Sequence, residues 1–320
     1  MIEHDRDVVE TLEERGWAAG EELVDAASLR SSSAAGRVHG LLVRSDWPLK
    51  RLHPSPSLAS ADVRIVRDDI RTAALIEELD ACQRQKLPDG SHFTVHPVAD
   101  GIGAWFEQIG WFLIDAARRR VVASPPGAER DAWEHRLVGF AVPMLLGELG
   151  ATVLHGCSVT VDGGAYVLCG PSGRGKTTTS LALVQAGAGL LSDDVTVLQR
   201  GDAPPVHPGP RGSRVLGAGG CKTLNIGGAA AVEPSPLRGL VVLEPRGSGP
   251  LLHRRPPADG FIALVSNLSP VSVTGRAAMF HGVAELSRSL PVHAATLPDD
   301  LAALPRSAVA LLAALSRSSS

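Results

Sequence analysis

Residues 168–180 read LCGPSGRGKTTTS, and this stretch decides the fold of the C-terminal half of the chain. The pattern G-x-x-x-x-G-K-[ST], which marks a loop that cradles phosphates, is satisfied by Gly170, Gly175, Lys176 and Thr177. An apolar run precedes the loop, and TTTSLALVQAGAG after it has helical composition and ends in glycine. The stretch therefore predicts a strand, a phosphate loop and a helix in an α/β domain.

Each part of the loop has a physical role. Its glycines allow positive φ angles, so that successive N–H groups and the N-terminus of the helix converge on an anion. Lys176 can reach the β- and γ-phosphates of ATP, and the Thr177 hydroxyl can take a Mg²⁺ position. A glycine-rich turn without a ligand is the alternative. The predicted nucleotide-binding residues are Gly170, Pro171, Ser172, Gly173, Arg174, Gly175, Lys176, Thr177 and Thr178.

Two adjacent carboxylates follow the helix in LLSDDVTVL, between two apolar runs. We expect a parallel sheet, in which the end of the neighbouring strand lies close to the phosphate loop. One carboxylate of the pair, Asp193 or Asp194, can then hold Mg²⁺ beside the Thr177 hydroxyl, because carboxylate and hydroxyl oxygens suit this ion. The other carboxylate can accept a proton from an attacking hydroxyl. The order of the two roles stays open, and so does a solvated strand end.

A histidine lies upstream of the loop, in TVLHGCSVTVDGGAYVLCG. The two apolar runs of this segment are joined by Asp162-Gly163, which predicts a β-hairpin. His155 starts the first run. It can be a satisfied strand residue, or an orienting or proton-sharing group, since its ordinary pKa is near 6.5.

Composition restricts the class of protein. The 320 residues carry 31 basic and 34 acidic side chains and a net charge of −3, so no bulk field favours nucleic acid or membranes. Four cysteines without a CxxC pair indicate neither a disulfide framework nor a zinc site. The polar N-terminus is unlike a signal peptide, and no apolar run approaches the roughly 20 residues of a membrane span. These features predict a cytoplasmic protein.

The chain divides by pattern into two parts. We expect a smaller, mainly β N-terminal domain over 1–126 and a P-loop domain with an α/β fold over 127–320. The N-terminal domain is either a substrate-recognition module or a packing scaffold. The predicted strands are 38–47, 61–69, 91–100 and 237–245, with a hairpin turning near 116–118; the predicted helices are 70–85, 127–150 with a kink at Pro143, 276–288 and 298–315; and 201–220 is an irregular loop.

The order of these motifs resembles the C-terminal catalytic domain of HPr kinase/phosphorylase. The shared layout is a histidine, a β-hairpin, the phosphate loop, one helix and a double aspartate, and it covers about residues 151–198. The resemblance implies ATP- and Mg²⁺-dependent transfer of the γ-phosphoryl group to a serine hydroxyl of a protein or peptide. It also implies that the magnesium and the acceptor are surrounded by His155, Asp193 and Asp194, with one aspartate as the base. Carried onto this chain, the resemblance favours Asp194 as the base and Asp193 as the residue nearer the metal.

The chain departs from that family elsewhere. The glycine-arginine-asparagine and glutamate-valine-alanine-alanine-methionine-asparagine signatures are absent, and residues 206–215 read VHPGPRGSRV. The resemblance therefore does not extend to phosphorylase activity, a hexamer or HPr itself as acceptor, and it leaves a homo-oligomer open. The layout is also similar to HPr-kinase-like proteins of peptide natural-product clusters, including lasso-peptide kinases that phosphorylate a serine of the precursor.

Phosphoryl transfer also needs cationic help for the developing charge. Among the candidates, we expect Arg211 and Arg214 to serve, from a Gly/Pro-rich loop that can close over the site. Each can equally be a solvated surface residue.

Two further functions remain open from the sequence. One is a kinase for a small molecule, such as an amino acid or a sugar. The other is a nucleotide-binding regulatory protein with weak ATPase activity, although a pure binder needs neither His155 nor the aspartate pair.

Overall fold

The computed structural model describes residues 34–318, except 58, 81, 88–89, 125–128, 202, 218–219, 225–230, 232, 249–250 and 270–274, and only the backbone of 213–217, 220–224 and 301. The described chain forms two compact units. We call Ala26–Ala151 with Pro270–Met279 the N-terminal unit, and Thr152–Ser269 with Phe280–Ser320 the C-terminal unit. The division falls after Ala151, whereas the sequence places a boundary after residue 126.

The N-terminal unit is built on a nine-stranded sheet of order β3-β1-β2-β4-β9-β8-β7-β6-β5. The single strand expected over 38–47 is wrong, because His39 and Gly40 adopt φ angles of 51° and 82° and turn the chain between two strands. The strands are β1 Ala35–Val38, β2 Leu41–Ser45, β3 His53–Pro54, β4 Val63–Arg67, β5 Gln85–Lys86, β6 His92–Val98, β7 Gly101–Phe106, β8 Gly110–Asp115 and β9 Arg120–Ala123.

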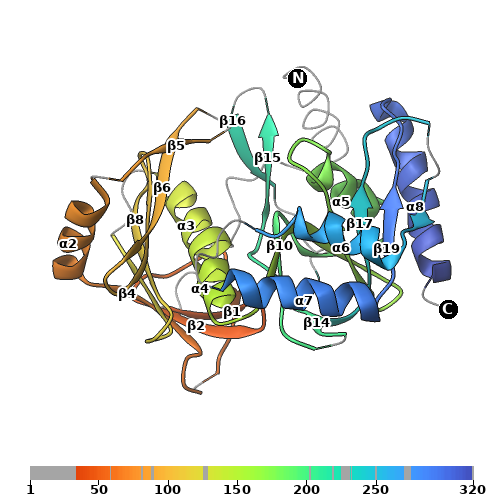
Figure 1. Cartoon of the computed structure of the whole chain (residues 1–320). Coiled ribbons are helices and arrows are strands. Elements are labelled where there is room, and N and C mark those ends of the chain that lie inside the picture. The colour runs from red at the N-terminus through yellow and green to blue at the C-terminus, as the bar shows by residue number, and fades with distance from the viewer. Residues whose placement is uncertain are drawn as a thin grey trace. The chain divides into compact units, whose positions relative to one another are not determined.

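Helices pack on both faces of this sheet (Figure 1). Helix α2 (Asp69–Asp80) buries Leu75 and Leu79 against Leu113 and Val122. The other face is covered by aromatic contacts from the helical run of α3 (Arg130–Arg136), a π-helical turn (Leu137–Ala141) and α4 (Val142–Glu148). Pro143 has no N–H for the preceding turn, and the π-helical turn lies directly before α4.

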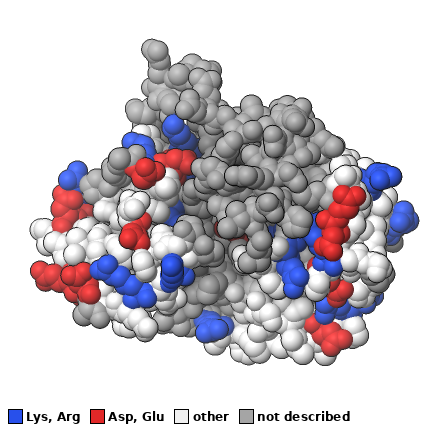
Figure 2. All heavy atoms as spheres, turned by 90° about the horizontal axis from the view of Figure 1, so that it is seen from above, with Lys and Arg blue, Asp and Glu red and all other residues white. Residues whose placement is uncertain are grey.

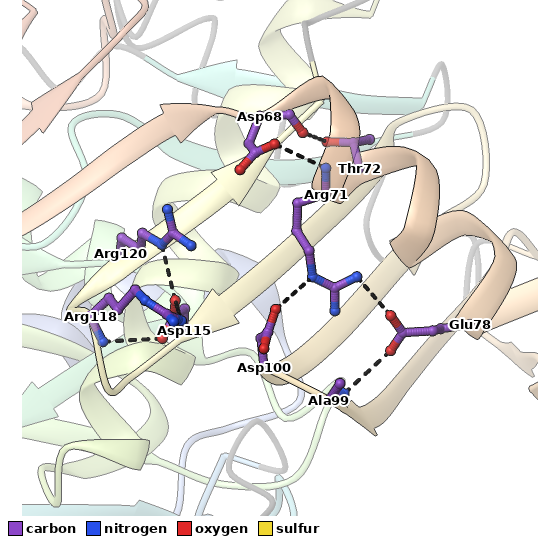
Figure 3. Close-up of polar contacts among 9 residues, drawn as sticks. All are labelled: Asp68, Arg71, Thr72, Glu78, Ala99, Asp100, Asp115, Arg118 and Arg120. Atoms are coloured by element: carbon purple, nitrogen blue, oxygen red, sulfur yellow. Dashed lines mark hydrogen bonds and ion pairs between the residues drawn. The ribbon is translucent and has the colours of Figure 1, made fainter.

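Charged side chains tie α2 to the neighbouring hairpin (Figure 3). Arg71 bonds Glu78 over 2.7 Å and Asp100 over 3.0 Å. The Asp115 carboxylate is fully buried and accepts hydrogen bonds from Arg118 over 2.9 Å and from Arg120 over 3.0 Å. Burial raises the pKa of Asp115, but these bonds outweigh that effect, so the pKa is lowered. On the molecular face in Figure 2, acidic and basic side chains of the described residues are interspersed.

The C-terminal unit contains a sheet of order β12-β10-β11-β17-β19-β18, with β13 also paired to β10 and β14 to β17. The strands of this sheet are β10 Thr152–Val161, β11 Gly164–Cys169, β12 Gly189–Ser192, β13 Val195–Leu198, β14 Pro205–Val206, β17 Ser235–Leu243, β18 His253–Arg254 and β19 Val292–Ala295. A separate two-stranded sheet is formed by β15 Ser213–Gly217 and β16 Gly220–Leu224. The helices of the C-terminal unit are α5 Lys176–Gln185, α6 Pro257–Val265, α7 Arg276–Ser289, which belongs to this unit from Phe280 on, and α8 Leu304–Ser318.

Two apolar clusters make this unit a three-layer α/β structure (Figure 1). Helices α5 and α8 pack on one face of the sheet, against Val159, Leu168 and Val241 among others. Helices α6 and α7 cover the opposite face, against Val167, Leu240 and Val292 among others. The mixed α/β class expected from the sequence is therefore confirmed.

The strands β11, β17 and β19 are parallel, whereas β10 is antiparallel to β11. The predicted hairpin is confirmed, and its turn residues Asp162 and Gly163 have positive φ angles of 48° and 73°. The expectation that the aspartate strand neighbours the phosphate-loop strand is wrong. The tight hairpin forces β10 to pair with β11, so β12 joins the far side of β10.

The prediction of an irregular loop over 201–220 is wrong in part. Strand β14 lies within this range, and β15 pairs with β16 as a hairpin. Within the described part of the chain, the helices are all too short or too polar to cross a bilayer.

Candidate functional site

The glycine-rich loop lies between β11 and α5, as the sequence predicts. Gly173 and Gly175 have φ angles of 79° and 80°, in the left-handed region that suits glycine. Gly175 is the N-cap of α5, so the loop leads directly into the positive end of the helix. At its start, the Gly170 N–H donates to the Asn267 side-chain oxygen over 2.8 Å.

Lys176 is folded back onto this loop and is only 8% exposed. Its Nζ donates to the Gly170 carbonyl over 2.8 Å and to the Pro171 carbonyl over 3.3 Å. Burial lowers the pKa of Lys176, while nearby thiols and the carboxylates of Asp193 and Asp194 oppose that shift. The ammonium group therefore lies at the loop, where the backbone N–H groups of a phosphate site converge.

Asp193 receives two hydrogen bonds on one oxygen. The Thr177 hydroxyl donates to Asp193 Oδ1 over 3.0 Å, and the Cys157 thiol donates to the same atom over 3.1 Å. Burial, followed by the charge of Asp193, raises the pKa of the Cys157 thiol well above 9, so the sulfur keeps its proton as a donor. The Asp193 carboxylate thus links the first turn of α5, through Thr177, to strand β10, through Cys157.

Asp194 faces His155, with 3.4 Å between Asp194 Oδ1 and His155 Nδ1. Asp194 has a positive φ of 67°, which is uncommon outside glycine and places it in the tight turn between β12 and β13. Burial lowers the pKa of His155, the Asp194 carboxylate raises it, and Lys176 lowers it further. The Asp194 side chain is 54% exposed, so a hydroxyl group from solution can reach it.

The structure brings most of the predicted site residues together. The Thr177 hydroxyl bonds Asp193, and the His155 ring lies beside the carboxylate of the adjacent Asp194. Arg174 is half-buried in the loop. Arg211 is half-buried ahead of β15, and Arg214 belongs to β15, where only its backbone is described. The participation of these arginines in the site stays a prediction.

Sequence reasoning missed three residues of this region. Asn267 is 5% exposed, and besides bonding Gly170 it accepts the His155 N–H at its backbone carbonyl over 2.9 Å. Cys157 lies in β10, and no motif in the sequence marks it as a site residue. Arg246 lies against Gly175. Alternation along β10 could have found Cys157, since residues two apart on a strand share a face and Cys157 follows His155 by two.

The oxygens of Thr177 and Asp193 fit a magnesium ion. They are hard ligands and lie 3.0 Å apart, and Thr177 belongs to the first turn of the helix that follows the phosphate loop. Magnesium bound to nucleotides takes one or two protein ligands and fills its remaining positions with phosphate oxygens and water.

Part of the sequence matches a known protein. No family model matches the chain. Over 85 residues, or 25% of the chain, the sequence is 39% identical to HPr kinase/phosphorylase of Lactobacillus acidophilus. The match spans only 26% of the length of that protein.

A solved structure, the Hpr(Ser) kinase/phosphatase from Coxiella burnetii, aligns with 52% of this chain and 97% of its own, at 17% identity and a TM-score of 0.30. A similarity of that size carries no argument about this fold. The sequence match confirms the predicted resemblance, and the chain is HPr-kinase-like over the matched stretch.

Proposed function

We propose that this protein is a kinase that moves the γ-phosphoryl group of ATP to a serine hydroxyl of a peptide or protein. The observation that carries the proposal is the pair of contacts made by the adjacent aspartates. Thr177 at the phosphate loop bonds Asp193, while His155 faces Asp194. A nucleotide-binding protein without transfer chemistry needs no second carboxylate with a histidine beside it.

The phosphates fit the loop between β11 and α5. Backbone N–H groups of the loop after Pro171 are proposed to face the anion, together with the positive end of α5. Lys176 exchanges its bonds to the Gly170 and Pro171 carbonyls for phosphate oxygens. Thr177 and Asp193 hold Mg²⁺, which neutralises charge on the phosphate oxygens when bound.

Transfer follows from the position of Asp194. The acceptor hydroxyl oxygen forms a bond to the γ-phosphorus, and the bond from this phosphorus to the β,γ-bridging oxygen breaks, which leaves ADP. The hydroxyl proton passes to the Asp194 carboxylate. His155 orients that carboxylate from 3.4 Å, and Asn267 holds the His155 backbone.

The acceptor is a serine presented on a flexible chain, because Asp194 is more than half exposed. A lasso-type precursor peptide is the acceptor that the sequence layout favours, and the N-terminal unit is the module proposed to recognise it. Arg211 and Arg214 are proposed to stabilise the transferred group. We further propose a cytoplasmic location, and a homo-oligomer is left open.

Intact-mass spectrometry after incubation with ATP and Mg²⁺ tests this function. The acceptors are HPr, a serine-ended precursor peptide encoded beside this protein, and free serine, each run with the Lys176→Ala variant as control. A gain of one phosphate on the peptide, lost in the variant, supports the proposal. Transfer to free serine alone supports a small-molecule kinase instead. ATP binding without transfer to any acceptor contradicts the proposed kinase and supports the regulatory protein.

A further inference from the structure

Arg246 lies at the edge of the sheet where the phosphate loop begins. Strand β17 runs parallel to β11, with Val242 level with Cys169, and ends at Leu243. Arg246 follows three residues later. In α/β sheets, ligands bind outside the carboxyl ends of the parallel strands, so this residue comes from the correct end of the sheet to meet a nucleotide.

The guanidinium group is held against the loop from two sides. Arg246 Nη1 donates to the Pro298 carbonyl over 2.9 Å, and Pro298 follows the neighbouring parallel strand β19. Arg246 Nη2 lies 2.5 Å from the position that a Cβ atom on Gly175 would occupy. The φ of 80° suits glycine at position 175, and the end of the Arg246 side chain occupies the space where a side chain at this position would begin. The cation rests on the N-cap of α5.

The charges around Arg246 are of the wrong sign for a structural ion pair. The N-terminus of α5 carries a partial positive charge, and Lys176, the residue after the N-cap Gly175, carries a full one. Among the described residues, no carboxylate lies within ion-pair distance of Arg246. Burial lowers its pKa, and only the more distant charge of Asp299 opposes this effect. A half-buried cation beside a helix N-terminus is unfavourable until an anion arrives.

We propose that Arg246 binds the polyphosphate of the nucleotide, as a third cationic element beside Lys176 and the N-terminus of α5. This inference rests on the proposed function and adds a residue to its site. The planar guanidinium offers several N–H donors, so one edge can keep the Pro298 carbonyl while the remaining donors bond phosphate oxygens. Arg246 is thus a binding residue for the phosphates and not for the base.

Isothermal titration calorimetry with two probes, MgATP and inorganic tripolyphosphate, tests this assignment. Arg246→Gln is compared with the intact chain, with Arg246→Lys and with Arg238→Gln. Arg238 is a matched control, because it lies near the other end of β17 and its side chain also fills the space beside a glycine, Gly164. We expect Arg246→Gln to weaken both probes by a similar factor, roughly 10- to 100-fold for a lost charged hydrogen bond. Arg246→Lys recovers part of the affinity, and Arg238→Gln changes neither.

Two results would overturn the inference. One is unchanged tripolyphosphate affinity in Arg246→Gln; if MgATP affinity falls in the same variant, the arginine belongs to the nucleoside. The other is an unmodified protein that binds neither probe, which removes the proposed function as well. An unmodified protein that binds both probes but transfers no phosphate, with Arg246→Gln weakened, contradicts the kinase and leaves the arginine assignment standing.

Discussion

The Thr177 hydroxyl and the Asp193 carboxylate lie 3.0 Å apart across 16 residues of sequence, and strand β10 makes that contact possible. Strand β10 pairs with β11 on one side and with β12 and then β13 on the other. The aspartates occupy the interruption between β12 and β13, so they face the first turn of α5 across a single strand. The sequence suggested that a parallel strand beside β11 would bring the aspartates to the phosphate loop. The antiparallel hairpin of β10 and β11 does so instead.

Removing the Thr177 hydroxyl tests the proposed metal position. Thr177→Val keeps the shape of the side chain but leaves Asp193 without one hydrogen bond and Mg²⁺ without one ligand. We expect the Mg²⁺ concentration for half-maximal transfer to rise roughly 10- to 100-fold. Thr177→Ser, which keeps the hydroxyl, stays near the original value. Equal Mg²⁺ dependence in both variants would contradict the role of Thr177.

Asp194→Asn tests the proposed base. The amide keeps the size of the side chain and its place beside His155 but cannot accept the acceptor proton. We expect kcat to fall by about 10²- to 10⁴-fold, the usual contribution of a general base. MgATP affinity, measured by calorimetry, changes little because Asp193 keeps the metal position. A fully active Asp194→Asn variant would exclude Asp194 as the base.

The thiol of Cys157 is expected to position Asp193. It shares Asp193 Oδ1 with Thr177, at 3.1 Å, and is fully buried. Cys157→Val removes that donor, so we expect a raised Mg²⁺ requirement with kcat reduced less than tenfold, within the range of a lost neutral hydrogen bond. Cys157→Ser restores a donor and recovers the Mg²⁺ requirement. If Val and Ser behave alike, the thiol only fills space.

The phosphate loop was predictable because each of its residues is specified by local chemistry. The left-handed φ angles at 173 and 175 favour glycine over any other residue. The Asp162-Gly163 turn fixes the hairpin that carries His155 toward the loop. Helix α7 and strand β17 likewise follow local apolar patterns. Such features are decided within about fifteen residues of sequence.

Contacts between distant segments could not be predicted in the same way. Asn267 comes after α6, within a region whose helix was not anticipated, and meets Gly170 across 97 residues. Arg246 lies in a Gly- and Ser-containing segment that the sequence marks only as a loop. Both depend on the order of strands in the sheet, which composition and periodicity do not specify.

Asn267 is expected to stabilise the loop. Its side chain accepts the Gly170 N–H over 2.8 Å and donates to the Ala263 carbonyl over 2.7 Å. Asn267→Ala leaves the buried Gly170 N–H without its acceptor, at a cost of about 1–3 kcal/mol. The urea midpoint of unfolding and the MgATP affinity should both fall. The matched control is Ser266→Ala, whose exposed hydroxyl bonds only the Ile262 carbonyl among described contacts. An equal loss in both variants would contradict this role.

The buried thiol of Cys169 is expected to resist ionisation and alkylation at alkaline pH. Burial between Gly156 and Val242 raises the pKa of its thiol to about 12, from an ordinary value of 9.0. Because the thiolate is the reactive form, about one thiol in ten thousand is ionised at pH 8. Peptide mass spectrometry after brief iodoacetamide treatment at pH 8 should find half-buried Cys82 alkylated and Cys169 intact.

The same shift sets the sign of a stability change. The folded state holds the Cys169 proton more tightly than the unfolded state, so the stability it contributes is complete below pH 9 and is lost as the pH rises toward 12. Cys169→Ala removes this titration, and its urea midpoint should fall less between pH 8 and pH 10 than that of the intact chain. Equal falls, or alkylation of Cys169 as fast as Cys82 in the native protein, would show that the thiol is not shielded by the sheet.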